Sequence, residues 1–402
     1  MRIGIEGQRL FRLEKHGMDI VAIELIKHLQ LIDKVNQYFI FVKEGVDDDW
    51  YTPTENFHLI RIKKKPYHIW EQILLPREVI RYKIELLHCT SNTAPIWLKT
   101  PLVLTLHDII YLENLRFVSF QSTAYQLAGN FYRRWVVPSV LKSAKRIITV
   151  SNTEKEIILN SYPNLKTKLS VIYNAMPDSF LNIDKSRYNN VREKYKLPEE
   201  YIFTLGNASP KKNMPNVLKA YVIYHQKEKL PLPLILADEP PKDVFNLLSA
   251  QIPKEVEKDI HFIGYVKNND IPYLYALSRV FIYASLRESF GIPILEAMAA
   301  GVPVITSKDS CMPEIAQNAA AFVDPKNPED IANTLHSVLS DKNLTDRLVE
   351  NGNKRFVEFT WLNSAKKVLD IYSLLYEEVK DRKPNRIMRK LELLLIKPSE
   401  EK

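Results

Sequence analysis

Two glutamates, Glu288 and Glu296, frame the part of the chain that is best suited to chemistry. Glu288 lies in a loop that also contains Gly291. Pro293 suits the first turn of a helix, which would place Glu296 about one turn inside that helix. A glycine-containing loop before a helix offers unpaired N–H groups and the positive end of a dipole, which bind phosphate, whereas carboxylates accept hydrogen bonds from hydroxyls. A nucleotide sugar, with a diphosphate between two polyols, matches both kinds of group.

The elements around the two glutamates place them at the edge of a sheet. Residues 280–284 (VFIYA) form an apolar run that predicts a strand leading toward Glu288. After the helix, Gly301 is a natural stop, and residues 302–305 (VPVI) predict a short buried strand. Open α/β sheets bind ligands at the carboxyl ends of their strands. The alternative is an ordinary loop followed by a helix with two solvated glutamates.

A second phosphate-type arrangement lies earlier in the chain, at Lys211 and Lys212. Residues 201–205 (YIFTL) predict a strand, which is followed by a loop with Gly206 and by a helix from about Pro215. A lysine at that place neutralises a leaving diphosphate and lowers the barrier to its departure. The alternative is a pair of ordinary surface charges.

The first half of the chain offers Gly17 and His107. Gly17 lies between an expected strand at residues 3–6 and a helix, although the loop lacks the G-x-G-x-x-G spacing of dinucleotide enzymes. His107 follows an expected strand at residues 102–106, and Asp108 could fix its tautomer. Such a histidine can hydrogen-bond a sugar hydroxyl or a phosphate. The alternatives are a glycine that serves only its turn and a capped loop histidine.

The two glutamates and the FGIPIL sequence between them resemble the signature of the retaining GT4-type glycosyltransferases, the glycosyltransferase group 1 family. The resemblance extends over nearly the whole chain. It implies an α/β protein of GT-B fold, in which two Rossmann-like domains with doubly wound parallel sheets face a central cleft. It also implies an N-terminal acceptor-side domain of residues 1–176 plus about 375–402, and a C-terminal nucleotide-sugar-binding domain of residues 177–374. The alternating strands and helices of both halves indicate the same architecture.

The activity implied by the resemblance is transfer of a hexosyl unit from a nucleoside diphosphate sugar to a hydroxyl of a glycan or lipid-linked acceptor, with retained anomeric configuration. Capsule, lipopolysaccharide or exopolysaccharide synthesis is the expected setting. We expect no cofactor and no metal, because Lys212, helix dipoles and backbone N–H groups supply a positive field at the leaving diphosphate. No residue stands out as a covalent nucleophile, so attack from the face of the leaving group is expected.

The resemblance also assigns roles to single residues. Glu288 and His107 would contact the transferred sugar and Lys212 the diphosphate, which makes these three the catalytic candidates. Glu296 would bind the ribose hydroxyls. Asn207 stands where the family often has an arginine, which removes one positive charge unless the lysine before Lys212 compensates. The further donor-binding candidates are Gly17, Gly206, Asn207, Lys211, Tyr265, Val266, Phe290, Gly291 and Ile292, and the acceptor candidates are Trp70, Glu71, Gln72 and Asp108.

The overall composition limits other classes of function. The 402 residues suffice for two or three domains, and 46% of them are hydrophobic. Lys and Arg number 56 against 48 Asp and Glu, a mild excess that does not argue for nucleic acid as a partner. Cys89 and Cys311 lie far apart without metal-binding neighbours, which predicts free thiols in a reducing compartment. Without a signal peptide or a membrane-spanning apolar run, we expect a cytoplasmic protein, with the inner face of the membrane as the alternative location.

Three charged segments allow more than one interpretation. Residues 47–49 (DDD) resemble the metal-binding D-x-D of the other large glycosyltransferase fold, but a solvated turn is favoured. The basic run at residues 63–65 (KKK) is either a solubilising face or a contact for an acceptor or a lipid headgroup. A basic tail helix would lie in a membrane interface or dock on the first domain or a partner. Its expected apolar positions are Ile387, Met388, Leu391, Leu394 and Leu395.

Two other classes of function stay open at this point. An NDP-sugar epimerase or a phosphorylase would use a similar fold and donor, and a non-catalytic saccharide-binding protein would keep the fold alone. The presence of Glu288, Glu296, Lys212 and His107 argues against loss of catalysis.

Overall fold

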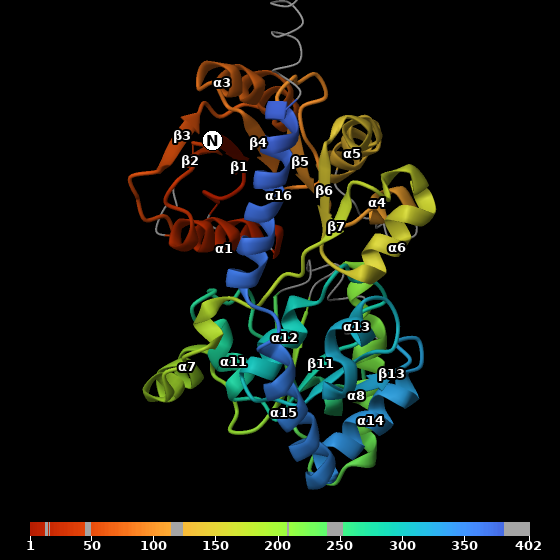
Figure 1. The fold of residues 1–402 in the computed structure, drawn as a ribbon. Coiled ribbons are helices and arrows are strands. Elements are labelled where there is room, and N and C mark those ends of the chain that lie inside the picture. Colours follow the sequence, from red (N-terminus) through yellow and green to blue (C-terminus); the bar gives the residue numbers. More distant parts are fainter. Residues whose placement is uncertain are drawn as a thin grey trace, which may run out of the picture.

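The computed structural model describes residues 1–12, 15, 17–44, 50–113, 124–206, 209–238 and 252–381. Two sheets of parallel strands lie one above the other, each covered by helices (Figure 1). The part built on the first sheet is called the first lobe, and the part built on the second sheet is called the second lobe. The expected α/β architecture of two doubly wound parallel sheets is confirmed.

The first sheet has the strand order β3-β2-β1-β4-β5-β6-β7, and the second has the order β10-β9-β8-β11-β12-β13. In each sheet, successive strands are added first on one side of the earliest strand, β1 or β8, and then on its other side. Doubly wound folds bind ligands at this point of reversal. The first sheet consists of β1 (Arg2–Glu6), β2 (Gln37–Lys43), β3 (Phe57–Ile62), β4 (Leu86–Cys89), β5 (Leu102–Thr105), β6 (Arg146–Thr149) and β7 (Leu169–Val171). The second consists of β8 (Ile202–Leu205), β9 (Leu234–Ala237), β10 (Ile260–Phe262), β11 (Val280–Tyr283), β12 (Val304–Ser307) and β13 (Ala320–Val323).

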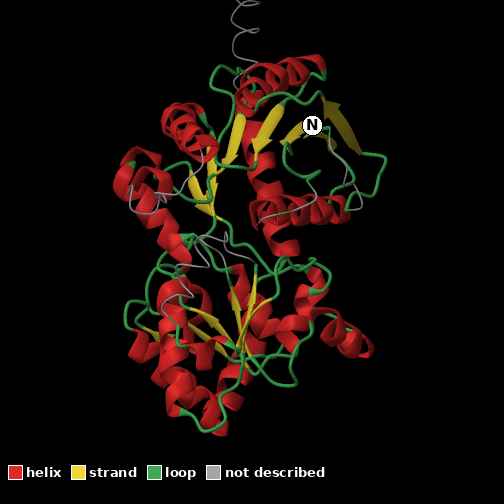
Figure 2. Ribbon diagram, turned by 180° about the vertical axis from the view of Figure 1, so that it is seen from behind, coloured by secondary structure: helices red, strands yellow, loops and turns green. Residues whose placement is uncertain are grey.

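The strands of the first sheet lie between helices (Figure 2). They are apolar on both faces, as parallel strands in this position must be. Along β2, Tyr38 and Ile40 belong to the core on one face, and Phe39 and Phe41 to the core on the other, because successive side chains alternate. The helices that complete these two cores are α1 (Gly17–Ile32) and α16 (Trp361–Asp381) on the first face, and α3 (Leu75–Arg81) and α5 (Ala124–Ser143) on the second.

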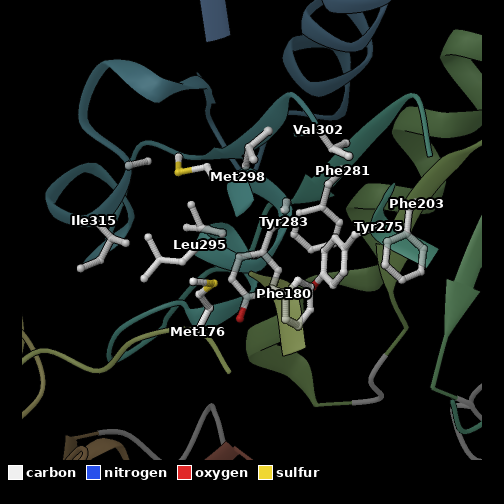
Figure 3. Close-up of a cluster of buried hydrophobic side chains, with 14 of the residues drawn as sticks. Met176, Phe180, Phe203, Tyr275, Phe281, Tyr283, Leu295, Met298, Val302 and Ile315 are labelled. Atoms are coloured by element: carbon white, nitrogen blue, oxygen red, sulfur yellow. The ribbon is translucent and has the colours of Figure 1, made fainter. Parts of the chain in front are cut away.

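The second lobe has its own core, in which Phe203 of β8, Phe281 of β11 and Leu295 pack together (Figure 3). Cys89 and Cys311 are buried free thiols, as expected. Within the described part of the chain, no helix is both long enough and apolar enough to cross a membrane. The remaining first-lobe helices are α2 (Tyr67–Ile69), the π-helical turn η1 (Trp70–Leu74), α4 (Ile110–Glu113) and α6 (Asn152–Ser161). The second-lobe helices are α7 (Tyr188–Tyr195), α8 (Met214–Lys227), α10 (Lys254–Glu257), α11 (Ile271–Ala276), α12 (Ile292–Ala299), α13 (Met312–Ala316), α14 (Pro328–Ser340) and α15 (Lys342–Phe356).

The chain passes between the lobes twice. The first crossing follows β7, and its Met176 packs into the second-lobe core. The second crossing leads into α16, where Trp361 belongs to the second-lobe core and Ala365 already belongs to a first-lobe core. Ser364 Oγ donates a 2.6 Å hydrogen bond to the Tyr173 carbonyl oxygen, so the two crossings lie side by side. The return to the first lobe therefore begins before the boundary near residue 375 that the sequence suggested.

Candidate functional site

The candidate site lies where loops from the carboxyl ends of both sheets meet. The loop after β5 contains Asp108, and the loop after β11 contains Ser289. Ser289 Oγ lies 3.5 Å from Asp108 Oδ2, which brings the residues adjacent to them, His107 and Glu288, into the same region. Ligands of open α/β sheets bind at this edge.

Glu288 is buried, with 7% of its surface exposed, and lies at the centre of a cluster of charges. Its Oε1 lies 2.8 Å from Lys212 Nζ, and its Oε2 lies 3.7 Å from Lys211 Nζ. Burial alone would raise the pKa of Glu288, but the charges of Lys212 and Lys211 lower it to about 2. The carboxylate is therefore charged at neutral pH. Two lysines against one glutamate leave the cluster positive, which suits an anionic ligand.

Glu296 has a different electrostatic setting. It lies on α12, and its Oε2 accepts a 3.0 Å hydrogen bond from the Tyr275 hydroxyl. Burial raises the pKa of Glu296 to about 7, although the Tyr275 hydrogen bond and the charge of Lys212 oppose the rise. Near neutral pH this carboxyl can therefore both donate and accept hydrogen bonds, as pairing with ribose hydroxyls requires.

Gly291 and Phe290 shape the loop between the two glutamates. Gly291 has φ +93°, in the left-handed region that favours glycine, and it caps α12. Phe290 is 3% exposed and anchors the loop against Tyr173 and Phe359, with ring centroids 5.9 and 5.8 Å away. Pro293 has no N–H, and the Ile294 N–H donates a 3.0 Å hydrogen bond to the carbonyl oxygen of the cap residue Gly291, so the N–H of Ile292 is the free donor expected at the first turn of α12. This is the helix terminus that the sequence predicted as the phosphate contact.

Gly206 and Gly17 differ in how much space surrounds the position of a Cβ atom. A Cβ atom at Gly206 would lie 3.0 Å from the carbonyl oxygen of Asp238, so close packing of the loop after β8 excludes a side chain. A Cβ atom at Gly17 would meet no atom of the described residues within 4 Å. Packing against the described part of the chain therefore does not explain the glycine at the start of α1. Space beside a helix N-terminus is what an approaching phosphate needs, and this role of Gly17 stays a prediction.

His107 is buried in the first lobe, with 5% of its surface exposed. Its Nε2 donates a 2.9 Å hydrogen bond to the Thr90 carbonyl oxygen, which leaves Nδ1 as an acceptor. Burial lowers the pKa of His107, so the ring is neutral at neutral pH. The expectation that Asp108 fixes this tautomer is wrong. The Thr90 carbonyl oxygen fixes it, and the Asp108 carboxylate instead accepts a 3.3 Å hydrogen bond from the Ile110 N–H.

Glu154 connects the loop after β5 with the loop after β11. It is fully buried in the first turn of α6, and its Oε2 accepts a 2.7 Å hydrogen bond from Arg287 Nη2. Its Oε1 accepts a 3.2 Å bond from the Ile109 N–H. Arg287 Nη1 also donates to the Glu288 carbonyl oxygen at 2.7 Å. From the sequence alone, residues 151–154 (SNTE) predict an N-cap and a capping box, so Glu154 has only a capping role there. The ion pair could not be predicted, because Arg287 lies 133 positions away.

A second carboxylate, that of Glu314 on α13, caps α6 from the other lobe. Its Oε1 accepts a 2.7 Å hydrogen bond from the Asn152 N–H, and its Oε2 accepts a 2.8 Å bond from the Thr153 N–H. Burial would raise the pKa of Glu314, but hydrogen bonds from Thr153 and Asn152 lower it. A charged carboxylate at a helix N-terminus satisfies free N–H groups and complements the dipole. The lobes are therefore joined through α6, beside the site.

The three neighbouring acceptor candidates have different positions. Trp70 is fully buried in the first-lobe core, because η1 turns it inward, so its expected contact with an acceptor is wrong. Glu71 is 1% exposed and accepts hydrogen bonds from the hydroxyls of Tyr67 and Tyr132. Gln72 also donates to the Tyr132 hydroxyl, at 2.8 Å. Glu71 and Gln72 thus hold the first-lobe elements together, and a direct contact with an acceptor stays a prediction for both.

The base-binding candidates follow β10. Tyr265 is 45% exposed and presents its ring at the surface, whereas Val266 is 4% exposed and belongs to the second-lobe core. Only the backbone of Val266 can contact a ligand. Asn207 lies outside the described residues, as do residues 47–49 and the basic tail.

Sequence reasoning missed Glu6 and Arg9 near the end of the first strand. The Thr90 hydroxyl donates a 2.9 Å hydrogen bond to the Glu6 carbonyl oxygen, next to the His107 contact. Burial raises the pKa of Glu6. The guanidinium of Arg9 lies 5.8 Å from the ring centre of Tyr67. The rule that selected His107, a polar residue at the carboxyl end of a parallel strand, also selects Glu6.

One group of side chains in the described ranges has the geometry of a metal site. Glu24, His28 and Asp178 offer ligand atoms that all lie within 4.8 Å of one another. Glu24 and His28 belong to α1, and Asp178 belongs to the first crossing. None of the three is on the loops after β8 or β11, so this group has no part in the contacts of Lys212 and Glu288.

Two family models match the chain, one for each lobe. The model described as Glycosyltransferase Family 4 matches residues 17–180. The model described as Glycosyl transferases group 1 matches residues 188–355. Together they include the loops that carry Gly17, His107, Lys212, Glu288 and Glu296.

Similar proteins include O-antigen chain mannosyltransferase B of Escherichia coli, which is 33% identical over 241 residues. That match covers 58% of this chain and 62% of the relative, so the chain spans less than two thirds of the relative's length. Sucrose-phosphate synthase of Thermosynechococcus elongatus has a TM-score of 0.72 at 16% identity, over 94% of this chain and 99% of that one. HepE of Anabaena, solved with UDP and glucose, has a TM-score of 0.70 at 18% identity, over 93% and 99%. At these identities the structural likeness concerns the fold.

Proposed function

The chain belongs to the GT4-type group 1 glycosyltransferases, and we propose that it moves a hexosyl unit from a nucleoside diphosphate sugar to a hydroxyl of a glycan or lipid-linked acceptor. We assign this transfer to the synthesis of a surface polysaccharide, such as a capsule, lipopolysaccharide or exopolysaccharide, because the similar proteins include an O-antigen mannosyltransferase. The observation that carries the proposal is the cluster of Lys212, Glu288 and Glu296 at the carboxyl edge of the second sheet.

The cluster provides one contact for each part of the donor. The charge of Lys212 lowers the pKa of both Glu288 and Glu296, so the lysine lies close to both carboxylates. A diphosphate beside Lys212, Lys211 and the start of α12 would place its two sugar ends toward the two glutamates. Glu296 would then bind the ribose and Glu288 the transferred sugar. Binding of the donor would draw Lys212 from Glu288 toward the diphosphate.

The proposed reaction retains the anomeric configuration. The bond between the anomeric carbon and the diphosphate oxygen breaks, and the bond to the acceptor oxygen forms on the same face of the sugar. The acceptor proton passes to an oxygen of the departing diphosphate, so no protein nucleophile is required. His107, neutral with Nδ1 as an acceptor, would take a hydrogen bond from a hydroxyl of the transferred sugar.

We propose that the reaction needs no metal, because the two lysines and the helix terminus supply the charge that the leaving group requires. Lys212 and Lys211 stabilise the negative charge that develops on the diphosphate, and the N-terminus of α12 adds the positive end of its dipole. These groups are in place before the reaction begins, so little rearrangement is needed at the transition state.

The proposed location is the cytoplasm, with the basic tail touching the inner face of the membrane. The support for this contact is the alternation of apolar and basic residues after residue 385 in the sequence. At the membrane surface the protein would meet a lipid-linked acceptor.

A donor screen followed by turnover measurements tests the proposed function. Binding to the folded state raises the unfolding temperature, so a thermal-shift screen with UDP-, GDP-, ADP- and TDP-sugars identifies the donor. With that donor, Lys212→Met and Glu288→Gln should each lower turnover by about 10²-fold or more. Lys219→Met, on the exposed side of α8, and Glu329→Gln, exposed on α14, are matched controls that should keep turnover.

The products separate this proposal from its alternatives. Release of free nucleoside diphosphate with a glycosylated acceptor supports transfer. Formation of an epimeric donor, or of a sugar phosphate that depends on added phosphate, would instead identify an epimerase or a phosphorylase. Wild-type turnover by Lys212→Met would remove that lysine from the mechanism.

A further inference from the structure

Three polar side chains gather where the first lobe meets the first crossing. Glu24 and His28 lie one turn apart on α1, and Asp178 lies in the crossing segment. Glu24 and His28 are buried, at 6% and 7% exposed, although charged side chains are seldom buried without a partner. One ligand atom from each of the three residues lies within 4.8 Å of the others. The group therefore has the residue types and the spacing of a metal site.

The hydrogen bond of His28 fixes which ring nitrogen faces Asp178. His28 Nδ1 lies 2.8 Å from the carbonyl oxygen of Glu24, and a carbonyl oxygen can only accept, so Nδ1 is the donor. In the neutral ring, Nε2 then carries a lone pair. Nε2 lies 3.4 Å from Asp178 Oδ2, which also presents lone pairs. Two lone pairs that face each other in this way repel unless a cation lies between them.

The distance between His28 Nε2 and Asp178 Oδ2 suits two ligands of one tetrahedral ion. Zinc binds imidazole nitrogen and carboxylate oxygen at about 2.0 to 2.2 Å, so two such ligands lie about 3.3 Å apart. The observed 3.4 Å agrees with this separation. Donation of the other ring N–H to a carbonyl oxygen is also the arrangement that orients most metal-binding histidines.

Glu24 supplies a third oxygen. Its Oε1 is paired with Lys27 Nζ at 3.0 Å, and its Oε2 lies 4.0 Å from His28 Nδ1. The charge of Lys27 weakens the attraction for a cation, but the pairing leaves Oε2 to turn toward an ion. The Asp178 side chain is 60% exposed, so an ion can enter from solvent and Asp178 can adjust to it.

We propose that Glu24, His28 and Asp178 bind a zinc ion, with water as the fourth ligand. One imidazole nitrogen and two carboxylate oxygens are a ligand set that suits zinc, whereas magnesium and calcium prefer oxygen ligands alone. Three protein ligands leave one position of the tetrahedron for water. The site is separate from the cluster around Lys212, and it does not depend on which sugar is transferred.

An ion at this position would connect the two lobes. Helix α1 packs in a first-lobe core through Ile26 and Leu29, and it lies on the side of the first lobe that faces the second (Figure 1). Asp178 lies two residues before Phe180, which is buried in the second-lobe core. Zinc would therefore link a first-lobe helix to a segment that is anchored in the second lobe.

Zinc titration of the full-length protein, purified without an affinity tag and treated with a chelator, tests the proposal. Calorimetry measures the affinity, and the unfolding temperature should rise because the ion binds the folded state. The wild type should bind one zinc ion at this site, and Asp178→Asn, His28→Gln and Glu24→Gln should each weaken that binding about tenfold or more. Asp178→Asn is the decisive variant, because its exposed side chain can be changed without disturbing a core.

The matched controls come from a second histidine–aspartate pair. His225 Nε2 lies 2.8 Å from Asp259 Oδ2, and no third ligand among the described residues completes a group there. His225→Gln and Asp259→Asn should therefore bind zinc as the wild type does. Cobalt(II) in place of zinc gives a second readout, because its visible absorption is much stronger in a four-coordinate site than in water. This absorption should weaken in Asp178→Asn.

Three results would overturn the proposal. Equal zinc affinity of the wild type and Asp178→Asn would show that the ion binds elsewhere. A larger rise of the unfolding temperature with magnesium or calcium than with zinc would show that the ion is not zinc. No effect of any ion would leave the contact as an ion pair between Asp178 and a protonated His28. Donor turnover of Asp178→Asn in chelator should equal that of the wild type, so a failure of zinc binding is distinct from a failure of the proposed transfer.

Discussion

Replacing Lys212 with methionine should raise the pKa of Glu288 and destabilise the fold at neutral pH. Methionine keeps an unbranched side chain but removes the charge that lies 2.8 Å from Glu288. The folded protein lowers the pKa of Glu288 from 4.5 to about 2. At about 1.36 kcal/mol per pKa unit, this shift stabilises the folded state by about 3 kcal/mol. Because the folded pKa is the lower one, this stability is present above pH 4.5 and is lost as the pH falls toward 2.

The pKa of Glu296 sets an upper limit on how far the pKa of Glu288 can rise in Lys212→Met. Glu296 is a buried carboxyl without such an ion pair, and its pKa is about 7. The two glutamates thus differ by about 5 pKa units, and Lys211, 3.7 Å from Glu288, supplies part of that difference. We expect Lys212→Met alone to move the Glu288 pKa to between about 4 and 6 and to cost about 3 kcal/mol of stability at neutral pH.

Carboxyl-carbon NMR titration measures the pKa of Glu288, and urea unfolding across the acidic and neutral range measures the stability. The loss of stability should be largest at neutral pH and should shrink in acid, where Glu288 becomes protonated in both proteins. Lys219→Met is the control, because it removes an exposed charge from α8, the helix that follows Lys212. If the pKa stays near 2 and Lys212→Met is no less stable than the control, the electrostatic argument for this cluster is wrong.

Three further results are expected. On folding, the pKa of Glu296 rises from 4.5 to about 7, so the stability of the wild type falls by about 3 kcal/mol as the pH rises through that interval. Glu296→Gln should remove this pH-dependent loss, and an equal dependence of the unfolding temperature on pH in both proteins would contradict the prediction. Glu154→Gln should lower kcat more than it raises the KM for the donor, since Arg287 loses its charged partner while Lys212 stays in place. A change in KM alone would be evidence that Glu154 does not position the loop of Arg287 and Glu288. Gly291→Ala should cost about 1 kcal/mol or more at φ +93° and lower turnover, and an unchanged unfolding temperature would exclude the strain.

Most strands of both sheets could be predicted because buried parallel strands are continuous apolar runs. The expected strand at residues 102–106 coincides with β5 to within one residue, and all four residues of β5 are buried. Strand β3 was missed, because its sequence FHLIRI is interrupted by His58 and Arg61 and lies at the edge of the sheet. Strand β3 is held by its pairing with β2, and a contact with another strand leaves no pattern in the sequence of β3 itself.

The parts of the site that depend on neighbours in sequence could also be predicted. Glu288 and Glu296 flank one loop and helix, and Lys212 precedes another helix, so spacing alone indicated an anion site with carboxylates around it. The ion pair of Arg287 with Glu154 could not be found this way, because it forms only when the two lobes meet. The prediction that Trp70 contacts an acceptor was wrong, because the sequence does not show which side of a helical turn faces the core.

The two crossings of the chain between the lobes are held together by the 2.6 Å hydrogen bond from Ser364 to Tyr173. Because the two crossing segments lie together, they would serve as a hinge about which the lobes open once the contacts of Glu314 with α6 and of Arg287 with Glu154 are broken. A twist about the long axis would instead pull the two crossing segments apart. Entry of the donor and exit of the product would then follow a single angular coordinate. Cutting that bond should add freedom in directions that do not serve catalysis.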